Sequence, residues 1–118
     1  MAKLTEEAKK IIAEAGPALI ATSSKNGKSH VQVKGSFRVL DDQNLVFVDI
    51  DSPRTMANLR DNPQLSTLVF DPETGRSCRI WGKTEILTKG ELFDSMAAEL
   101  GKKVKHLVHL KVGEVETF

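Results

Sequence analysis

The sequence has one cysteine, one tryptophan and no tyrosine among its 118 residues. A single cysteine excludes an internal disulfide and every zinc pattern that needs several cysteines. The longest uncharged stretches, residues 16–24 and 62–70, are only about half as long as a membrane span. The first residues also lack the apolar core of a signal peptide. We therefore expect a soluble, cytoplasmic protein with no membrane partner.

An excess of charge of one sign is absent as well. The 17 basic and 16 acidic side chains leave a formal net charge of +1. Such a chain has no overall field that would attract phosphate backbones or anionic lipids. Proteins that bind single strands also need aromatic stacking platforms, and aromatic residues make up only 5% of this chain. We expect no nucleic-acid partner.

The composition that is present, 40% hydrophobic and 28% charged, is typical of one globular domain spanning residues 1–118. Apolar residues at helical spacing predict a first helix over residues 4–15, with Thr5 as its cap and Gly16-Pro17 as its end. A buried strand over residues 18–24 follows. Asn26-Gly27 then predicts a type I′ hairpin turn, in which both residues have positive φ.

Residues 29–40 alternate between apolar and polar side chains, which predicts one continuous strand. We expect its apolar side to face the core and its polar side to face away from it. The apolar set is Val31, Val33, Phe37 and Val39, and the polar set is His30, Gln32, Lys34, Ser36 and Arg38.

The remaining pattern predicts four more strands and two more helices. Strands are expected over 45–50, 65–70, 78–87 and 105–112, and helices from Pro53 to about Asn62 and over 92–100. Consecutive strands joined mostly by turns exclude a doubly wound parallel sheet, which needs a crossover helix after nearly every strand. The expected fold class is mainly β with short helices, as a six-stranded antiparallel barrel.

Familiar catalytic patterns are missing. The chain has no phosphate-loop motif and no glycine fingerprint for dinucleotide binding. His106 and His109 lie three apart on one predicted strand, so they face opposite sides and cannot share a metal. Cys78 within a strand is typical of a small buried hydrophobe. We expect no metal site and no cysteine nucleophile.

The most informative segment is the start of the second predicted helix. Ser52, Arg54 and Thr55 arrive there in one turn, together with unpaired backbone N–H groups, which suits a phosphate. The alternative is an ordinary helix start with a solvated Arg54. On the polar side of the strand over 29–40, Lys34 is suited to hold negative charge on a heteroaromatic ring, and the alternative is an exposed polar face. Strand and helix would then bind two ends of one ligand.

Four segments follow one another along the chain: HVQVKGS at 30–36, SPRT at 52–55, NLRDNP at 58–63 and RIWGKTE at 79–85. In this order they resemble the FMN-binding split barrels related to pyridoxamine 5′-phosphate oxidase. The resemblance implies a six-stranded antiparallel split barrel that forms a homodimer, with FMN at the subunit interface. It also implies that the phosphate lies on Ser52, Arg54 and Thr55, and that the flavin ring lies along the strand that carries Gln32, Val33, Lys34 and Ser36.

The resemblance further implies an oxidoreductase that transfers hydride or electrons between a donor and a small-molecule substrate. The alternatives are a non-catalytic flavin-binding or carrier protein, and a deazaflavin- or haem-binding member of the same superfamily. The chain ends soon after its last predicted strand, so we do not expect pyridoxamine oxidation. We expect Trp81 to pack in the core or at the dimer interface.

Overall fold

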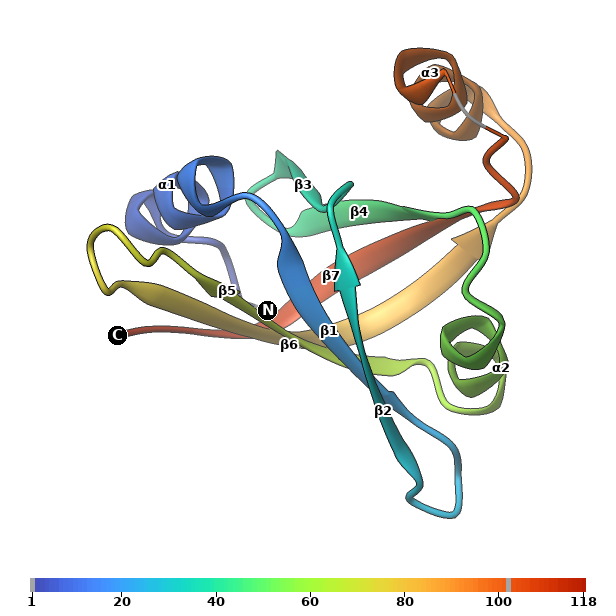
Figure 1. Cartoon of the computed structure of the whole chain (residues 1–118), viewed down its shortest axis with the longest axis horizontal. Helices are drawn as coiled ribbons and strands as arrows, with labels where there is room; N and C mark the ends of the chain where they lie inside the picture. Colours follow the sequence, from blue (N-terminus) through green and yellow to red (C-terminus); the bar gives the residue numbers. More distant parts are fainter. Residues whose placement is uncertain (1, 102) are drawn as a thin grey trace.

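The computed structural model describes residues 2–101 and 103–118, which form seven strands and three helices (Figure 1). The helices are α1 (Glu6–Ala15), α2 (Pro53–Asp61) and α3 (Glu91–Leu100). The strands are β1 (Ala18–Ser23), β2 (Ser29–Lys34), β3 (Arg38–Asp41), β4 (Asn44–Asp49), β5 (Gln64–Phe70), β6 (Ser77–Leu87) and β7 (His106–Thr117).

All seven strands belong to one antiparallel sheet in the order β2-β1-β5-β6-β7-β4-β3. The expected fold class, a mainly β antiparallel split barrel, is confirmed. The single strand expected over 29–40 is wrong, because a turn at Gly35 and Ser36 interrupts it. Its two halves, β2 and β3, lie at opposite edges of the sheet, so the strand count is seven rather than six.

The main core lies inside the curled sheet and is closed by α1. The Thr5 hydroxyl accepts a hydrogen bond from the Ala8 backbone N–H at 3.0 Å, which confirms the expected helix cap. One face of the helix then presents Ala8, Ile11 and Ile12 to the sheet. Among the residues that they join are Ile20, Leu45, Phe47, Leu65, Val69, Cys78, Ile80, Val108 and Leu110.

A smaller apolar cluster lies under α3, on the other side of β4 and β7. Val46, Val48 and Leu107 meet Met96 of the helix there. Alternate residues of β4 therefore face different layers, since Leu45 and Phe47 belong to the main core. This double coverage explains why five of the six residues of β4 are buried.

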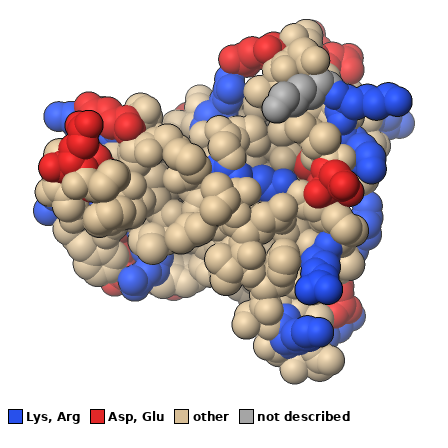
Figure 2. Space-filling model, viewed as in Figure 1, with Lys and Arg blue, Asp and Glu red and all other residues tan. Residues whose placement is uncertain are grey.

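The outer face of β2 is apolar, which corrects the expected orientation of its side chains. Val31 and Val33 are 61% and 57% exposed, whereas Lys34 is only 8% exposed. The alternation was predicted, but the polar side faces inward because it meets α2 and the end of β4. Leu19 on β1 and Phe70 on β5 are also exposed, and Figure 2 shows a largely uncharged surface over these strands.

The β1–β2 hairpin differs from the expected type I′ turn. No non-glycine residue in the described ranges has positive φ, so Asn26 does not adopt the expected conformation. Gly27, at φ 88°, takes the left-handed position alone, and its N–H donates to the Ser24 carbonyl at 2.9 Å. Within the same described ranges, no helix is long and apolar enough to cross a membrane.

Candidate functional site

The split between the two edges of the sheet opens a cleft of about 510 Å³. Ligand pockets typically measure about 300–1,000 Å³, so the cleft has room for a cofactor-sized molecule. It lies where β2 ends, beside β4 and the segment that leads into α2. Its lining residues are Gln32, Lys34, Gly35, Ser36, Val48, Ile50, Asp51, Ser52 and Leu100.

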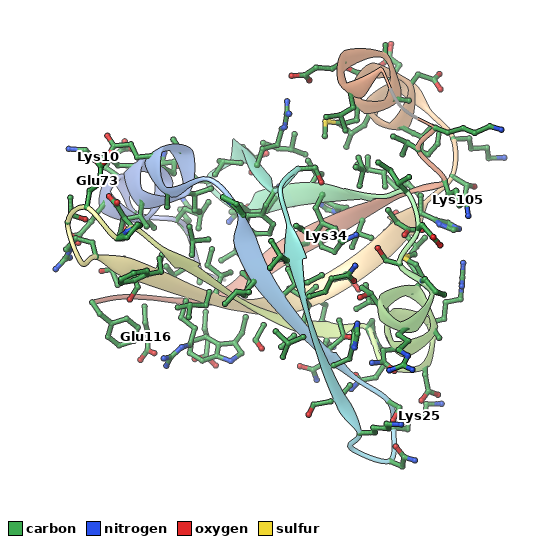
Figure 3. All side chains as sticks on the ribbon, in the orientation of Figure 1. Lys10, Lys25, Lys34, Glu73, Lys105 and Glu116 are labelled. Carbon is green, nitrogen blue, oxygen red and sulfur yellow. The ribbon has the colours of Figure 1, made fainter. Side chains whose placement is uncertain are left out.

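Lys34 provides the cation of this cleft and is labelled near the centre of Figure 3. Its ammonium group donates to the Ser52 hydroxyl and lies 5.8 Å from the centre of the Phe47 ring. Burial lowers the pKa of Lys34, and the Asp49 carboxylate partly opposes that effect by favouring the charged form. The cleft therefore contains a cation that has lost much of its hydration.

A short hydrogen-bond network joins the start of α2 to β2. The Gln32 side-chain N–H donates to the Ser52 hydroxyl at 3.3 Å, and the Thr55 hydroxyl donates to the Gln32 side-chain oxygen at 2.6 Å. Ser52 occupies the expected N-cap position, but its side chain caps no backbone group. The Met56 N–H donates to the Ser52 carbonyl. Pro53 has no N–H, so in the first turn the N–H groups of Arg54 and Thr55 are the ones that have no acceptor within the helix.

Arg54 lines a second, smaller cleft of about 240 Å³, which lies on the same polar side of β2 but nearer the β1–β2 hairpin. Three of its lining residues carry groups suited to an anion: Lys28, His30 and Arg54. The others are Ser29, Ala57 and Asn58. The first turn of α2 thus contributes Ser52 to the large cleft and Arg54 to the small one.

The predicted site residues therefore separate into groups. Gln32, Lys34, Ser36 and Ser52 line the large cleft together. Ser36 also accepts a hydrogen bond from the Val48 backbone N–H at 3.0 Å, which fixes the turn against β4. Arg54 is in the small cleft, Thr55 is fully buried and reaches Gln32, and Val33 points to the outer face.

Sequence reasoning missed a charged group beneath the large cleft. Asp49, at the end of β4, is 2% exposed and lies 2.6 Å from the Nδ1 atom of His106 on β7. The Nε2 atom of His106 lies 3.1 Å from a guanidinium nitrogen of Arg60 on α2. The three residues are far apart in the chain, and the only local signal is an aspartate that ends an apolar strand.

Two other candidate residues have structural roles. Cys78 is fully buried, and burial raises the pKa of its thiol to about 11, so the thiolate that a nucleophile needs is suppressed. His109 lies with its Nε2 atom 2.6 Å from the side-chain oxygen of Asn44 on the neighbouring strand. Neither residue lines the two clefts described above.

The residues present fit the groups that FMN would bring. A phosphate needs cations and N–H donors, which Arg54 and the first turn of α2 supply. A flavin ring presents carbonyl oxygens and ring nitrogens, for which Lys34 and Gln32 are suitable donors. Asp51 also lines the large cleft, and no aromatic side chain is among its nine lining residues. Polar contacts rather than aromatic stacking would orient a ring there.

Solved structures with this fold come from several organisms. A variant of HupZ from Group A Streptococcus superposes with a TM-score of 0.87 at 24% identity, covering 98% of this chain and 99% of that one. An FMN-binding protein from Syntrophomonas wolfei has a TM-score of 0.79 at 17% identity, covering 91% and 80%. HutZ, the haem storage protein of Vibrio cholerae, has a TM-score of 0.68 at 19% identity, covering 100% and 94%.

These identities establish the shared fold and do not establish a shared ligand. No curated protein sequence matches the chain. The family model described as pyridoxamine 5′-phosphate oxidase (PNPOx_N) matches residues 4–118, which is nearly the whole sequence. The chain therefore belongs to the pyridoxamine 5′-phosphate oxidase family.

Proposed function

We propose that this protein binds FMN as a homodimer and serves as an oxidoreductase that acts on a small-molecule substrate. The observation that carries the proposal is the pair of clefts that follow one another along the polar side of β2, beside the start of α2. Each cleft holds a cation, Lys34 in the large one and Arg54 in the small one. Such an arrangement suits one ligand with a phosphate at one end and a polar ring at the other.

In this proposal the small cleft takes the phosphate and the large cleft takes the ring. Arg54 pairs with the phosphate, and His30 and Lys28 add positive charge or hydrogen-bond donors beside it. Lys34 and Gln32 bind the ring from β2. Because Ser52 accepts from both Lys34 and Gln32, it holds these two donors in place.

The bound FMN supplies the capacity to accept and donate hydride or electrons. The protein supplies orientation and charge. The ammonium group of Lys34 stabilises negative charge that develops on the ring, and its partial burial strengthens that interaction. This role requires no side chain to act as a strong acid or base, consistent with the absence of any conventional catalytic triad from the sequence.

The homodimer is proposed from the apolar outer face of the sheet. Val31, Val33, Leu19 and Phe70 are each more than two-fifths exposed, and Trp81 lines a shallow hollow on the same face. Exposed apolar surface of this kind typically marks an interaction site. A second copy of the chain would cover this face and shield the neighbouring clefts from water.

Three alternatives remain beside this proposal: a carrier, a haem-binding protein and a deazaflavin-binding protein. A carrier would bind FMN and support no turnover with reduced nicotinamides and common acceptors. The fold shared with HutZ, a haem storage protein, favours haem as the second candidate ligand. Deazaflavin presents a similar ring and phosphate to the same two clefts.

The test is the visible absorption spectrum of the purified protein before and after addition of FMN and gel filtration. Flavin bands that elute with protein at the mass of a dimer support the proposal, and turnover assays then separate enzyme from carrier. Protein that stays colourless with FMN contradicts it. Titration with haem and deazaflavin would then identify which alternative holds.

A further inference from the structure

A row of three side chains leads from the buried interior beneath the large cleft to the surface of α2. Asp49 and His106 are directly opposite each other in the β4–β7 ladder, so their side chains lie on the same face of the sheet. The Asp49 Oδ2 atom lies 2.6 Å from His106 Nδ1. On the other side of the ring, His106 Nε2 lies 3.1 Å from Arg60 Nη2.

The chemistry of the two ends fixes the proton on the imidazole. An arginine side chain can only donate hydrogen bonds, so His106 Nε2 must accept from Arg60. The ring proton is then on Nδ1, where it is donated to Asp49. The contacts thus describe a neutral imidazole between a carboxylate and a guanidinium group, in one tautomer.

We propose that His106 is a positioning residue for the cofactor site, whose neutral form fastens α2 to β4 and β7 and whose protonation releases Arg60. A proton on Nε2 would turn this nitrogen into a donor that faces the N–H donors of Arg60. It would also place the positive charge of the imidazolium beside that of the guanidinium group. The contact with Asp49 would become an ion pair and persist. The tie to α2 would therefore be lost while the strands stay joined.

His106 is the main partner of the Asp49 carboxylate. The Oδ1 atom of Asp49 has no hydrogen-bond partner in the described part of the chain. Lys34 on β2 lies over the ring of Phe47, which is two residues before Asp49 and on the same face of β4. The charges of Lys34 and Asp49 attract each other, but the two groups form no ion pair within 4.0 Å. Lys105, the preceding residue, is exposed, and its backbone N–H donates to the Asp49 carbonyl.

The remaining strand beside β7 adds no charge at this point. The β6 ladder ends with Leu87 opposite Leu107, one residue short of His106. Among the residues that the structure describes, the charged groups that face the imidazole are Asp49 from β4 and Arg60 from α2, with Lys34 behind Asp49.

The consequence for cofactor binding rests on the proposed function. The residues that we assign to the two clefts, Ser52 and Arg54, lie on either side of Pro53, the first residue of α2. Histidine is the side chain that ordinarily changes charge between pH 5 and 8. Release of Arg60 at the C-terminal end of α2 would loosen the helix and weaken FMN binding as the pH falls.

The first experiment compares FMN dissociation constants of the wild-type protein and His106→Gln between pH 8 and 5.5. Glutamine can accept from Arg60 at every pH and does not titrate. We expect the affinity of the wild type to fall about fivefold more than that of the variant, as for the loss of one ordinary hydrogen bond. The phosphate of FMN titrates equally in both measurements. His109→Gln, whose parent residue contacts Asn44 instead, should keep the wild-type profile.

Arg60→Met provides a second variant at an exposed position, where folding is not at risk. At every pH it should bind FMN with the lower affinity that the wild type shows at pH 5.5. Its affinity should change with pH as little as that of His106→Gln. A pH profile that is the same in wild type, His106→Gln and Arg60→Met would overturn the proposal.

Nuclear magnetic resonance of the imidazole nitrogens tests the same proposal without any cofactor. At pH 8 the proton of His106 should be on Nδ1, and a proton on Nε2 would overturn the proposal. Hydrogen exchange of the α2 amides should be faster in wild type than in His106→Gln at pH 5.5 and equal at pH 8. These two measurements decide the role of His106 even if the protein binds no FMN, in which case only the proposed function fails.

Discussion

The Thr55 hydroxyl donates to the side-chain oxygen of Gln32 at 2.6 Å, and this bond joins the first turn of α2 to the edge strand β2. Thr55 is fully buried, so its replacement by valine leaves the Gln32 oxygen without that donor. We expect Thr55→Val to lower the free energy of unfolding by about 1–3 kcal/mol. Urea denaturation measures the change.

A matched threonine provides the control for that measurement. Thr84 donates to the Pro63 carbonyl at 2.9 Å from a partly exposed position, where water can replace it. Thr84→Val should therefore cost less than Thr55→Val. If the two variants lower the free energy of unfolding equally, the bond from Thr55 to Gln32 contributes no more than a solvent-exposed hydrogen bond.

Arg54 is expected to provide most of the protein's charge for the phosphate of FMN. Removing a hydrogen bond to a charged group costs about 1.5–3 kcal/mol, so Arg54→Ala should weaken FMN binding about 10- to 150-fold. Fluorescence titration with FMN measures this loss. Arg76→Ala is the control, because Arg76 pairs with Glu7 of α1, away from both clefts. Unchanged affinity in Arg54→Ala would remove this arginine from the site.

The proposed dimer depends on the outer face of β2. Val31→Glu places a charge at a position that is 61% exposed in the single chain, so it should leave the fold intact and oppose burial against a second copy. Light scattering should then give the mass of a monomer. Leu40→Glu on β3, where the leucine is 41% exposed, should remain a dimer. A wild-type protein that is itself monomeric with saturating FMN would contradict the proposed assembly.

The burial of Lys34 makes stability depend on pH in the alkaline range. Burial lowers the pKa of Lys34 below its ordinary value of 10.5, so between the two values the unfolded chain binds a proton that the folded chain has lost. Unfolding then takes up a proton, and the free energy of unfolding rises with pH across that window. Lys34→Met should remove this rise. Urea denaturation at a series of alkaline pH values, taken as the difference between the two proteins, cancels the contribution of the other lysines.

The ends of the helices could be predicted because they depend on local residues. Thr5 caps α1 through its own hydroxyl, and Pro53 occupies the first turn of α2 as expected. Asn62 ends that helix just before Pro63. Each of these features is decided within about four residues of the chain, which is the range over which sequence patterns carry information.

The break between β2 and β3 was missed because the apolar alternation continues through it. Gly35 and Ser36 were the only sign that the strand bends, and a glycine inside a strand pattern often marks such a point. The inverted orientation of Val31 has a different cause. Alternation shows that the two faces of a strand differ, but it does not show which face meets the core.

Only part of the site could be predicted from the sequence. Spacing groups residues that share one element, such as Gln32 and Lys34 on β2, or Ser52 and Arg54 at the start of α2. The contact of Asp49 with His106 depends on β4 pairing with β7, and the contact with Arg60 depends on where α2 lies against both. Only the three-dimensional order of the strands brings these residues together.

The strand order also determines when the large cleft can form during synthesis. β7 follows all the other strands in the chain, yet it lies inside the sheet, between β6 and β4. The β3–β4 hairpin leaves the ribosome early but pairs with no other strand until β7 has been made. One wall of the cleft can therefore form only after β7 has been made, and folding should show the slow kinetics typical of long-range strand pairing.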